Sequence, residues 1–219
     1  MENKKTAIVI GATGLVGGHL VNQLLEDDEI EKVILFVRRN SGKSHPKLQE
    51  LVVDFDQIDS FKDMIKADLV FSCMGTTLKT AGSKDAQWKI DYTYQHEFAN
   101  AAKENGVESF VLVSSSGANP KSKIFYSRMK GELEEAIKAM NFSNLHIFQP
   151  SVLVGERAEK RSGEESGAKV IRILSKLIPP LKKWRPIKGE EVAKAMLKAS
   201  LSEEYKGYQL FVLDQIFKI

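Results

Sequence analysis

The sequence predicts an α/β fold in which a doubly wound parallel β-sheet is covered by helices on both faces. Short apolar segments, rich in β-branched residues, alternate along the chain with segments whose apolar residues follow helical spacing. Each apolar segment is nearly continuous, without the alternation of a sheet that has one face in water, so both faces should be buried. A glycine-rich turn joins the first apolar segment to the first helical one.

Six segments are predicted to be strands, and helices are predicted between them. The strands occupy 6–11, 31–38, 48–55, 67–75, 108–117 and 144–155. The helices occupy 14–28, about 57–66 and 83–106, and a further helix contains Tyr126 and Lys130. The long helix ends at Gly106, because glycine readily adopts the left-handed conformation that closes a helix.

The C-terminal part of the chain, about 151–219, is less regular and is too short for a core of its own. We expect one domain over 1–219, in which this part is a substrate-side extension packed on the C-terminal edge of the sheet. It should contain a helix at about 190–201 and a strand at about 207–213. The basic amphipathic stretch 168–187 could cover the substrate pocket, pack in a dimer or lie on a membrane surface. Its double proline argues against one continuous interfacial helix, which favours a lid or packing role.

Composition excludes several classes of protein. The formal net charge is only +3, and no block of like charges is present, so nucleic-acid binding is not expected. A single cysteine allows no intramolecular disulfide. The start, "MENKKTAIVIGATG", lacks the apolar region of a signal peptide, and no apolar run reaches the roughly 18 residues of a membrane span. The four scattered histidines have no metal-ligand spacing. These features predict a cytoplasmic protein without an integral membrane segment or a metal site.

The glycine turn predicts a Rossmann-type nucleotide site. Gly11, Gly14 and Gly17 in "GATGLVGG" are spaced G-x-x-G-x-x-G between the first strand and the first helix. A tight turn requires a residue that tolerates positive φ, and a backbone that approaches a pyrophosphate requires residues without Cβ. The free N–H groups and the dipole at the helix start attract the phosphates.

The end of the second strand predicts NADP(H) in preference to NAD(H). An NAD site has an acidic residue about 20 residues beyond the glycine turn, where it binds the ribose hydroxyls. Here the strand ends in "FVRRN", with Arg38 and Arg39 at that place. A carboxylate would repel a 2′-phosphate, whereas a guanidinium group binds it with charge-assisted hydrogen bonds.

Two further strand ends should face the same ligand. The fourth strand ends in "FSCMGTT", which places Met74 and Gly75 against the ribose of a cofactor. Cys73 has no adjacent basic residue to form a thiolate, so we interpret it as a small core residue. The fifth strand ends in "VSSSG", and either Ser115 or Ser116 could hold a substrate oxygen; we favour Ser116.

The helix that follows contains Tyr126 and Lys130, one turn apart. Its apolar stripe belongs to neighbouring positions, namely Phe125, Met129, Leu133, Ile137 and Met140. Tyr126 and Lys130 therefore lie together at the border of the core. A phenol is a poor proton carrier at neutral pH, but a nearby ammonium favours the phenolate. The pair could then transfer a proton to or from a substrate oxygen. Gly131 should let another backbone or the cofactor come close.

These features, in this order, resemble the short-chain dehydrogenase/reductase superfamily in its extended or atypical branch, from about residue 6 to 157. The similarity is greatest to the Tat-interacting-protein-like oxidoreductases, which bind NADPH. The matching segments are "GATGLVG", "FVRRN", "VVDFD", "CMGTT", "VSSSGANPKSKIFYSRMKGELE" and "FQPSVLVGER". Two positions depart from the extended pattern, with Asp91 where asparagine is usual and Gln149 where arginine is usual.

The resemblance implies a role for each matching position. Tyr126 would be the proton carrier, while Lys130 would bind the nicotinamide ribose and tune the tyrosine. Cofactor contacts would come from Thr13, Gly14, Leu15 and Val16 at the phosphates, Arg38 and Arg39 at the 2′-phosphate, Phe55 at the adenine, Met74 and Gly75 at the ribose, Leu153 at the carboxamide, and also from Tyr126 and Arg161.

Two functions are compatible with the sequence. One is an NADPH-dependent oxidoreductase that acts on a carbonyl or alcohol of a small molecule, as a monomer or a homodimer. The other is a regulatory or interaction protein that binds NADPH with little turnover. Both require the glycine turn and the arginines, but only the first requires Tyr126 and Ser116. The substrate cannot be read, because the loop 75–85 and the C-terminal part follow no motif.

Overall fold

The computed structural model describes residues 4–155 and 183–219 of the chain, and it contains a seven-stranded sheet. The strand order is β3-β2-β1-β4-β5-β6-β9, and all neighbouring strands are parallel. This topology confirms the predicted doubly wound, Rossmann-type fold. The strands are β1 (Lys5–Ile10), β2 (Ile30–Val37), β3 (Leu48–Val52), β4 (Leu69–Ser72), β5 (Ser109–Val113), β6 (Asn144–Gln149) and β9 (Tyr208–Val212).

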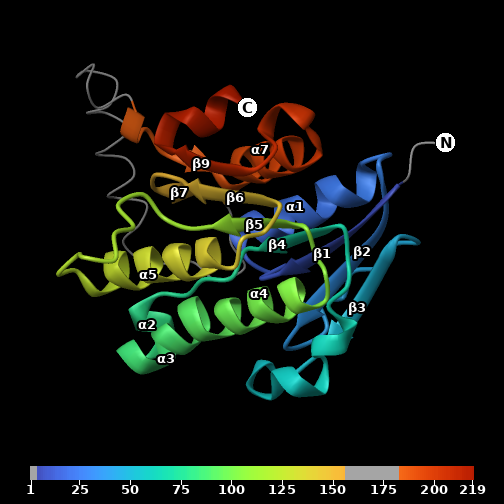
Figure 1. The fold of residues 1–219 in the computed structure, drawn as a ribbon, viewed down its shortest axis with the longest axis horizontal. Coiled ribbons are helices and arrows are strands. Elements are labelled where there is room, and N and C mark those ends of the chain that lie inside the picture. Colours follow the sequence, from blue (N-terminus) through green and yellow to red (C-terminus); the bar gives the residue numbers. More distant parts are fainter. Residues whose placement is uncertain (1–3, 156–182) are drawn as a thin grey trace.

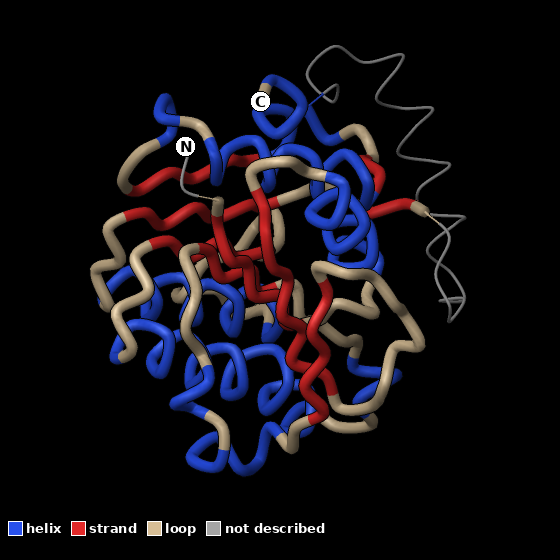
Figure 2. Tube along the Cα trace, turned by 90° about the vertical axis from the view of Figure 1, so that its right-hand side faces the viewer, coloured by secondary structure: helices blue, strands red, loops and turns tan. Residues whose placement is uncertain are grey.

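Helices cover both faces of the sheet (Figures 1 and 2). On one face lie α1 (Leu15–Glu26) and α7 (Gly189–Leu201), and on the other lie α4 (Tyr94–Glu104) and α5 (Phe125–Ala139). Successive strand residues point to opposite faces, so each strand contributes to two apolar cores. In β1, for example, Val9 packs in the core beneath α1 and Ile10 in the core beneath α4. This burial on both sides explains why the strands are continuously apolar.

The central strands end earlier than the sequence pattern predicts. β4 ends at Ser72 and β5 at Val113, whereas strands were expected as far as residues 75 and 117. Met74, Gly75 and the serines therefore lie in the loops just past the carboxyl ends of the sheet. Such loops form the ligand crevice of an open parallel sheet.

The long helix predicted at 83–106 contains a π turn. It consists of α3 (Lys84–Trp88), a π segment (Lys89–Thr93) and α4, and the Tyr94 N–H bonds to the carbonyl of Lys89, five residues earlier. A short helix, α2 (Leu78–Ala81), precedes it. π turns are rare and often occur at functional sites.

The short helix predicted at about 57–66 is replaced by two 3₁₀ turns, at Phe55–Ser60 and Lys62–Met64. Gln57 has non-helical backbone angles, which interrupt the segment. Phe55, Phe61 and Ile65 are its buried apolar side chains, and their spacing does not form a helical stripe.

The C-terminal residues join the fold through two parallel pairings. β9 pairs with β6 at the edge of the main sheet, and β7 (Leu153–Val154) pairs with β8 (Ile187–Lys188). The predicted helix at about 190–201 is α7, and the predicted strand at about 207–213 is β9. Two 3₁₀ turns, Glu203–Tyr205 and Leu213–Lys218, flank β9. Most of the stretch 168–187 lies outside the described residues.

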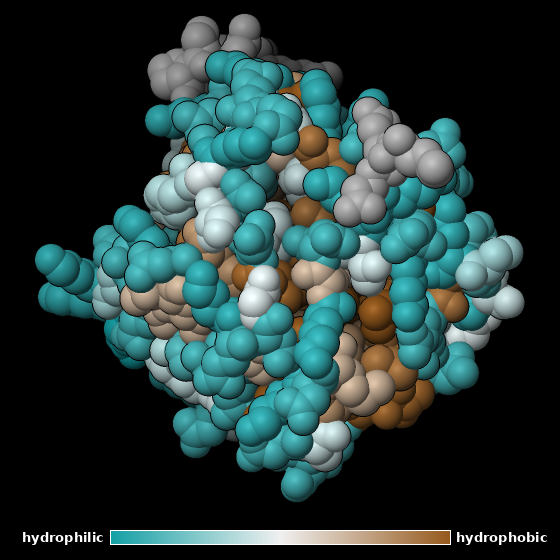
Figure 3. Space-filling model, turned by 45° about the vertical axis from the view of Figure 1, so that its right-hand side comes forward, coloured by the Kyte–Doolittle hydropathy of each residue, from teal (hydrophilic) through white to brown (hydrophobic). Residues whose placement is uncertain are grey.

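The surface is of mixed polarity. On the face in Figure 3, hydrophobic residues gather in separate patches between hydrophilic ones. None of the helices in the described ranges is both long enough and apolar enough to cross a lipid bilayer.

Candidate active site

A cleft of about 680 Å³ brings the predicted site residues together. The glycine turn, the ends of β2, β4 and β5, and the start of α5 all contribute to its walls. The predicted residues that line it are Gly11, Thr13, Gly14, Leu15, Val16, Arg38, Arg39, Phe55, Met74, Gly75, Tyr126, Lys130 and Leu153. Gly17 and Ser116 are not among its lining residues, and Arg161 lies outside the described residues.

The glycine turn is packed too tightly for side chains. Gly11 has φ of +76°, and a Cβ there would meet the backbone carbon of Cys73 at 2.4 Å. A Cβ on Gly17 would meet the carbonyl oxygen of Gly11 at 2.3 Å. Gly11 thus allows the turn to run against the end of β4, and Gly17 allows α1 to run against the turn. Gly17 therefore shapes the site without lining it.

The end of the cleft beside β2 is positively charged. Arg38 and Arg39 are exposed, and neither forms a hydrogen bond or ion pair with another residue of 4–155 or 183–219. Lys43, His19 and Asn22 also line this end, and Lys43 Nζ donates to Asn22 Oδ1 at 2.7 Å. No carboxylate occurs among the described lining residues. Lys43, His19 and Asn22 were not predicted as site residues, because none of them belongs to a recognisable motif.

Phe55 closes the same end of the cleft. It is buried and lies in an aromatic cluster, with ring centroids 5.6 Å from Tyr94 and 5.9 Å from Phe61. These neighbours fix its ring at the cleft wall, where a planar group could pack against it.

Tyr126 and Lys130 line the opposite end of the cleft but differ in exposure. Tyr126 is 37% exposed at the rim, whereas Lys130 is 2% exposed. The predicted apolar stripe is buried at Met129, Leu133 and Ile137. The sequence pattern placed Lys130 at the border of the core, and the structure instead buries it beside a carboxylate.

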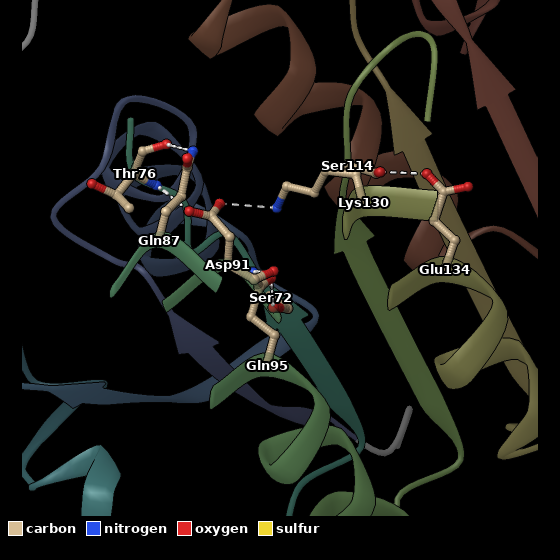
Figure 4. Close-up of polar contacts among 8 residues, drawn as sticks. All are labelled: Ser72, Thr76, Gln87, Asp91, Gln95, Ser114, Lys130 and Glu134. Atoms are coloured by element: carbon tan, nitrogen blue, oxygen red, sulfur yellow. Dashed lines mark hydrogen bonds and ion pairs between the residues drawn. The ribbon is translucent and has the colours of Figure 1, made fainter. Parts of the chain in front are cut away.

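That carboxylate is Asp91, in the π segment. Lys130 Nζ lies 3.2 Å from Asp91 Oδ1, and the Asp91 side chain is fully buried (Figure 4). Burial acts to lower the pKa of the Lys130 ammonium, but attraction to Asp91, followed by that to Tyr126, outweighs it and raises the pKa above its ordinary value. Lys130 is therefore a protonated, partly compensated cation.

Asp91 also organises the loop after β4. Its Oδ2 accepts the Thr76 N–H at 2.9 Å, and its backbone carbonyl accepts Gln95 Nε2 at 2.8 Å. Gln95 in turn accepts the Ser72 hydroxyl at 2.7 Å. This network connects β4, the π segment and α5 (Figure 4). It therefore fixes the position of the cleft loop at Thr76 relative to Lys130.

The serine that lines the cleft is Ser114, the first residue after β5. Its hydroxyl donates to Glu134 Oε1, and Gln149 Nε2 donates to both oxygens of Glu134. Ser116 donates its N–H to the Pro150 carbonyl at 3.0 Å. Ser114 was not predicted from the sequence, because the expected strand extended past the actual end of β5 and favoured Ser115 or Ser116.

The remaining reactive groups offer little chemistry. Cys73 is half-buried, and desolvation raises the pKa of its thiol to about 12, which disfavours a thiolate. Within 4–155 and 183–219, no three histidine, cysteine or acidic side chains gather in a way that could hold a metal ion.

A parallel sheet with a glycine turn and a cationic cleft at its carboxyl end defines a Rossmann-type NAD(P)-binding protein. Residues 11–152 match the NAD(P)H-binding family. The chain belongs to this family, in agreement with the resemblance found in the sequence.

The relatives include fungal proteins named FMP52. The protein of Candida glabrata is 38% identical over 212 residues, covering 94% of this chain and 89% of the relative. The protein of Saccharomyces cerevisiae is 32% identical over 214 residues, covering 94% and 91%. Both are named as mitochondrial proteins. The expectation of a cytoplasmic location is therefore wrong: it relied on the absence of recognisable signals, and such an absence does not define a compartment.

Solved structures support the fold at low sequence identity. The Bordetella bronchiseptica enzyme WbmH, in complex with NAD⁺, has a TM-score of 0.72 at 16% identity, covering 95% of this chain and 75% of the enzyme. A short-chain dehydrogenase/reductase superfamily protein from Agrobacterium tumefaciens, with bound NAD, has a TM-score of 0.71 at 17% identity, covering 95% and 77%. The family match identifies the cofactor of this chain as a nicotinamide nucleotide.

Proposed function

We propose that this protein is an NADPH-dependent oxidoreductase that transfers hydride to or from a carbonyl or alcohol of a small molecule. The observation that carries the proposal is the shared cleft. Tyr126 and Lys130 line one end of this cleft, and Arg38 and Arg39 line the other end. The glycine turn lines the same cleft.

The described residues fit NADP(H). The glycine turn runs against the end of β4 at Gly11 and leads into the start of α1, whose free N–H groups and dipole would attract a pyrophosphate. Arg38, Arg39 and Lys43 would meet the 2′-phosphate, and Phe55 would lie near the adenine. The absence of a carboxylate among the described lining residues favours NADP(H), because a ribose 2′-hydroxyl is usually recognised by one.

The bound cofactor would supply or accept the hydride, and the proton would move at Tyr126 Oη. At the exposed rim of the cleft, Tyr126 can meet a substrate oxygen. Lys130, one helical turn further on, presents a fixed positive charge at the same end of the cleft. Ser116, beyond the end of β5, remains the proposed partner of the substrate oxygen.

A specific observation also supports the second function, an NADPH-binding protein with little turnover. Asp91 replaces the asparagine that is usual in extended members, and its carboxylate faces Lys130 at 3.2 Å. Because Asp91 offsets the charge of Lys130, less of that charge would act on a proton transfer in the cleft than with a free ammonium. Such a site could hold the cofactor well and transfer protons slowly.

One experiment separates the two functions. NADPH binding is measured by calorimetry, and NADPH oxidation is then followed across a panel of aldehydes, ketones and quinones. NADP⁺ reduction is followed across the corresponding alcohols. Turnover that depends on Tyr126 supports the oxidoreductase, whereas tight NADPH binding without turnover on any compound supports the binding protein.

The names of the fungal relatives support a mitochondrial location for this chain as well. Subcellular fractionation with an antibody against the chain tests this location. Enrichment with a mitochondrial matrix or membrane marker is expected, and recovery only in the soluble cytosol would contradict it.

A further inference from the structure

Ser114 has a fixed place at the reactive end of the cleft. It follows β5 directly, is buried, and donates its backbone N–H to the Phe148 carbonyl at 2.8 Å. This bond extends the pairing of β5 with β6 by one residue. Ser114 also lines the cleft together with Tyr126 and Lys130. Its hydroxyl is therefore a polar group at the place where a nicotinamide and a substrate would meet.

The hydrogen of that hydroxyl is already used. The hydroxyl donates this hydrogen to Glu134 Oε1. Glu134 lies on α5 one turn after Lys130 and two turns after Tyr126, so the three side chains share one face of the helix. Gln149, the last residue of β6, donates Nε2 to the two Glu134 oxygens at 3.0 and 2.9 Å. Gln149 is buried, so its amide is a fixed donor that keeps the carboxylate turned toward Ser114.

Two neighbours hold the Glu134 carboxylate as an acceptor, because Ser114 and Gln149 both donate hydrogen bonds to it. Burial, with a smaller contribution from the charge of Glu135, raises the pKa of the Glu134 carboxyl above its ordinary value, although the contacts with Ser114 and Gln149 and the charge of Lys130 oppose this shift. An ionised carboxylate can only accept hydrogen bonds, so it holds the Ser114 hydrogen in one direction.

A serine hydroxyl has one hydrogen and two lone pairs. With the hydrogen directed at Glu134, the lone pairs of Ser114 remain for the cleft. We propose that Glu134 and Gln149 are positioning residues that make Ser114 a hydrogen-bond acceptor for a donor group of the bound molecule. The donor is a hydroxyl or an amide N–H. This inference rests on the proposed function, and it gives Ser114 a role different from that of a serine that donates to the substrate oxygen.

The donor could belong to the cofactor or to the substrate. The carboxamide of a nicotinamide carries an N–H₂ group, and its ribose carries hydroxyls. A hydroxylated substrate would present the same chemistry next to its reacting carbon. Measuring cofactor binding and substrate kinetics separately distinguishes these two sources.

The test compares four variants: Ser114→Ala, Glu134→Ala, Glu134→Gln and Glu135→Gln. Glu135→Gln is the matched control, because Glu135 is the exposed neighbour of Glu134 on the same helix. The Glu134→Gln amide keeps an oxygen that can accept from Ser114, so this variant should rescue the function that Glu134→Ala loses. Urea unfolding of each variant identifies any that fail to fold.

Cofactor binding is measured by calorimetry with NADP⁺ and with its 3-acetylpyridine analogue, in which a methyl ketone replaces the carboxamide. If the donor is the carboxamide, Ser114→Ala should weaken NADP⁺ binding about 3- to 10-fold and leave binding of the analogue unchanged, as expected for the loss of one hydrogen bond. If the donor is a ribose hydroxyl, binding of both should weaken. If it belongs to the substrate, cofactor binding should stay constant while KM rises by a similar factor for the hydroxylated compounds of the panel.

In each case Glu134→Ala should follow Ser114→Ala, while Glu134→Gln and Glu135→Gln should resemble the wild type. The inference is overturned if Ser114→Ala changes neither cofactor binding nor KM. It is also overturned if no compound is turned over and Ser114→Ala leaves cofactor binding unchanged. It is also overturned if Glu134→Gln behaves like Glu134→Ala. A wild-type protein that binds NADP⁺ without turnover would contradict the oxidoreductase proposal, but the binding measurements would still test Ser114.

Discussion

The ammonium nitrogen of Lys130 lies 3.2 Å from Oδ1 of Asp91, and both side chains are shut off from solvent. Lys130 belongs to α5 and Asp91 to the π segment before α4, so the pair joins two helices behind the cleft. Asp91 is also the acceptor for the Thr76 N–H in the loop after β4. One carboxylate thus controls both the charge of the lysine and the position of a cleft loop.

Removing one partner of this pair should be costly. Asp91→Ala leaves a buried, uncompensated ammonium, and we expect the free energy of unfolding to fall by about 3–5 kcal/mol. The double variant Asp91→Ala, Lys130→Met should recover part of this loss, because no buried charge remains. Urea unfolding at neutral pH measures the free energy of unfolding of the single and the double variant. Asp85→Ala, at an exposed position of α3, is the control and should cost less than about 1 kcal/mol. Equal losses in Asp85→Ala and Asp91→Ala would contradict the account.

Gly131 allows a loop to pass against α5. A Cβ at Gly131 would meet the backbone nitrogen of Pro120 at 2.3 Å, so Gly131→Ala should destabilise the protein by about 1–3 kcal/mol despite the better helix propensity of alanine. Gly18 lies inside α1 with nothing closer than 3.6 Å, and Gly18→Ala should instead stabilise by about 0.5–1 kcal/mol. Thermal unfolding without cofactor compares the two. The same sign of change in both variants would argue against the close contact.

His146 should make stability depend on pH. Burial lowers the pKa of its imidazole, although a hydrogen bond to the Tyr205 carbonyl partly opposes this effect. The folded protein therefore favours the neutral ring. This contribution to stability is complete above the ordinary pKa of about 6.5 and is lost as the pH falls through the lowered value.

The measurement is the free energy of unfolding of the wild type, His146→Gln and the exposed control His45→Gln between pH 8 and 5. The decrease toward pH 5 should be smaller in His146→Gln than in the wild type, and unchanged in His45→Gln. If all three proteins lost stability in parallel, the buried imidazole would not be the cause.

Arg38 and Arg39 should determine the choice of cofactor. A charge-assisted hydrogen bond contributes about 1.5–3 kcal/mol, so Arg38→Ala should weaken NADPH binding roughly 10- to 100-fold. NADH lacks the 2′-phosphate, and its binding should change little. Arg128→Ala is the control, because Arg128 pairs with Glu132 and is not among the residues that line the cleft. Calorimetric titrations give the ratio of the NADPH and NADH dissociation constants for each variant. Equal weakening of NADH binding and NADPH binding in Arg38→Ala would rule out 2′-phosphate recognition by Arg38.

Most of the fold could be predicted because its signals are local. Buried parallel strands are continuously apolar, and the glycines at 11, 14 and 17 predict a tight turn between the first strand and the first helix, where a phosphate would bind. The strand ends were less predictable. Cys73 and Met74 continue the apolar pattern past Ser72, the last residue of β4, and the three serines after Val113 do not indicate where β5 ends. For this reason the sequence favoured Ser116, whereas Ser114 lines the cleft.

The buried polar contacts could not be predicted, because they depend on pairs far apart in the chain. Asp91 and Gln149 each depart from the extended pattern, and the sequence alone gives no partner for either. In the fold, Asp91 meets Lys130 and Gln149 meets Glu134. The π turn that buries Asp91 has no sequence signature in the pattern of apolar residues along 83–106.

The most direct test of the proposed function is the turnover of Tyr126→Phe at saturating NADPH, on the best compound of the carbonyl panel. Tyr208→Phe, in a tyrosine of similar exposure on β9, is the matched control. NADPH affinity should stay within about twofold of the wild type, because the phenol contributes little to binding of the nucleotide. Turnover should fall at least roughly 100-fold, the usual effect of removing a proton carrier. Wild-type turnover in Tyr126→Phe would contradict the account.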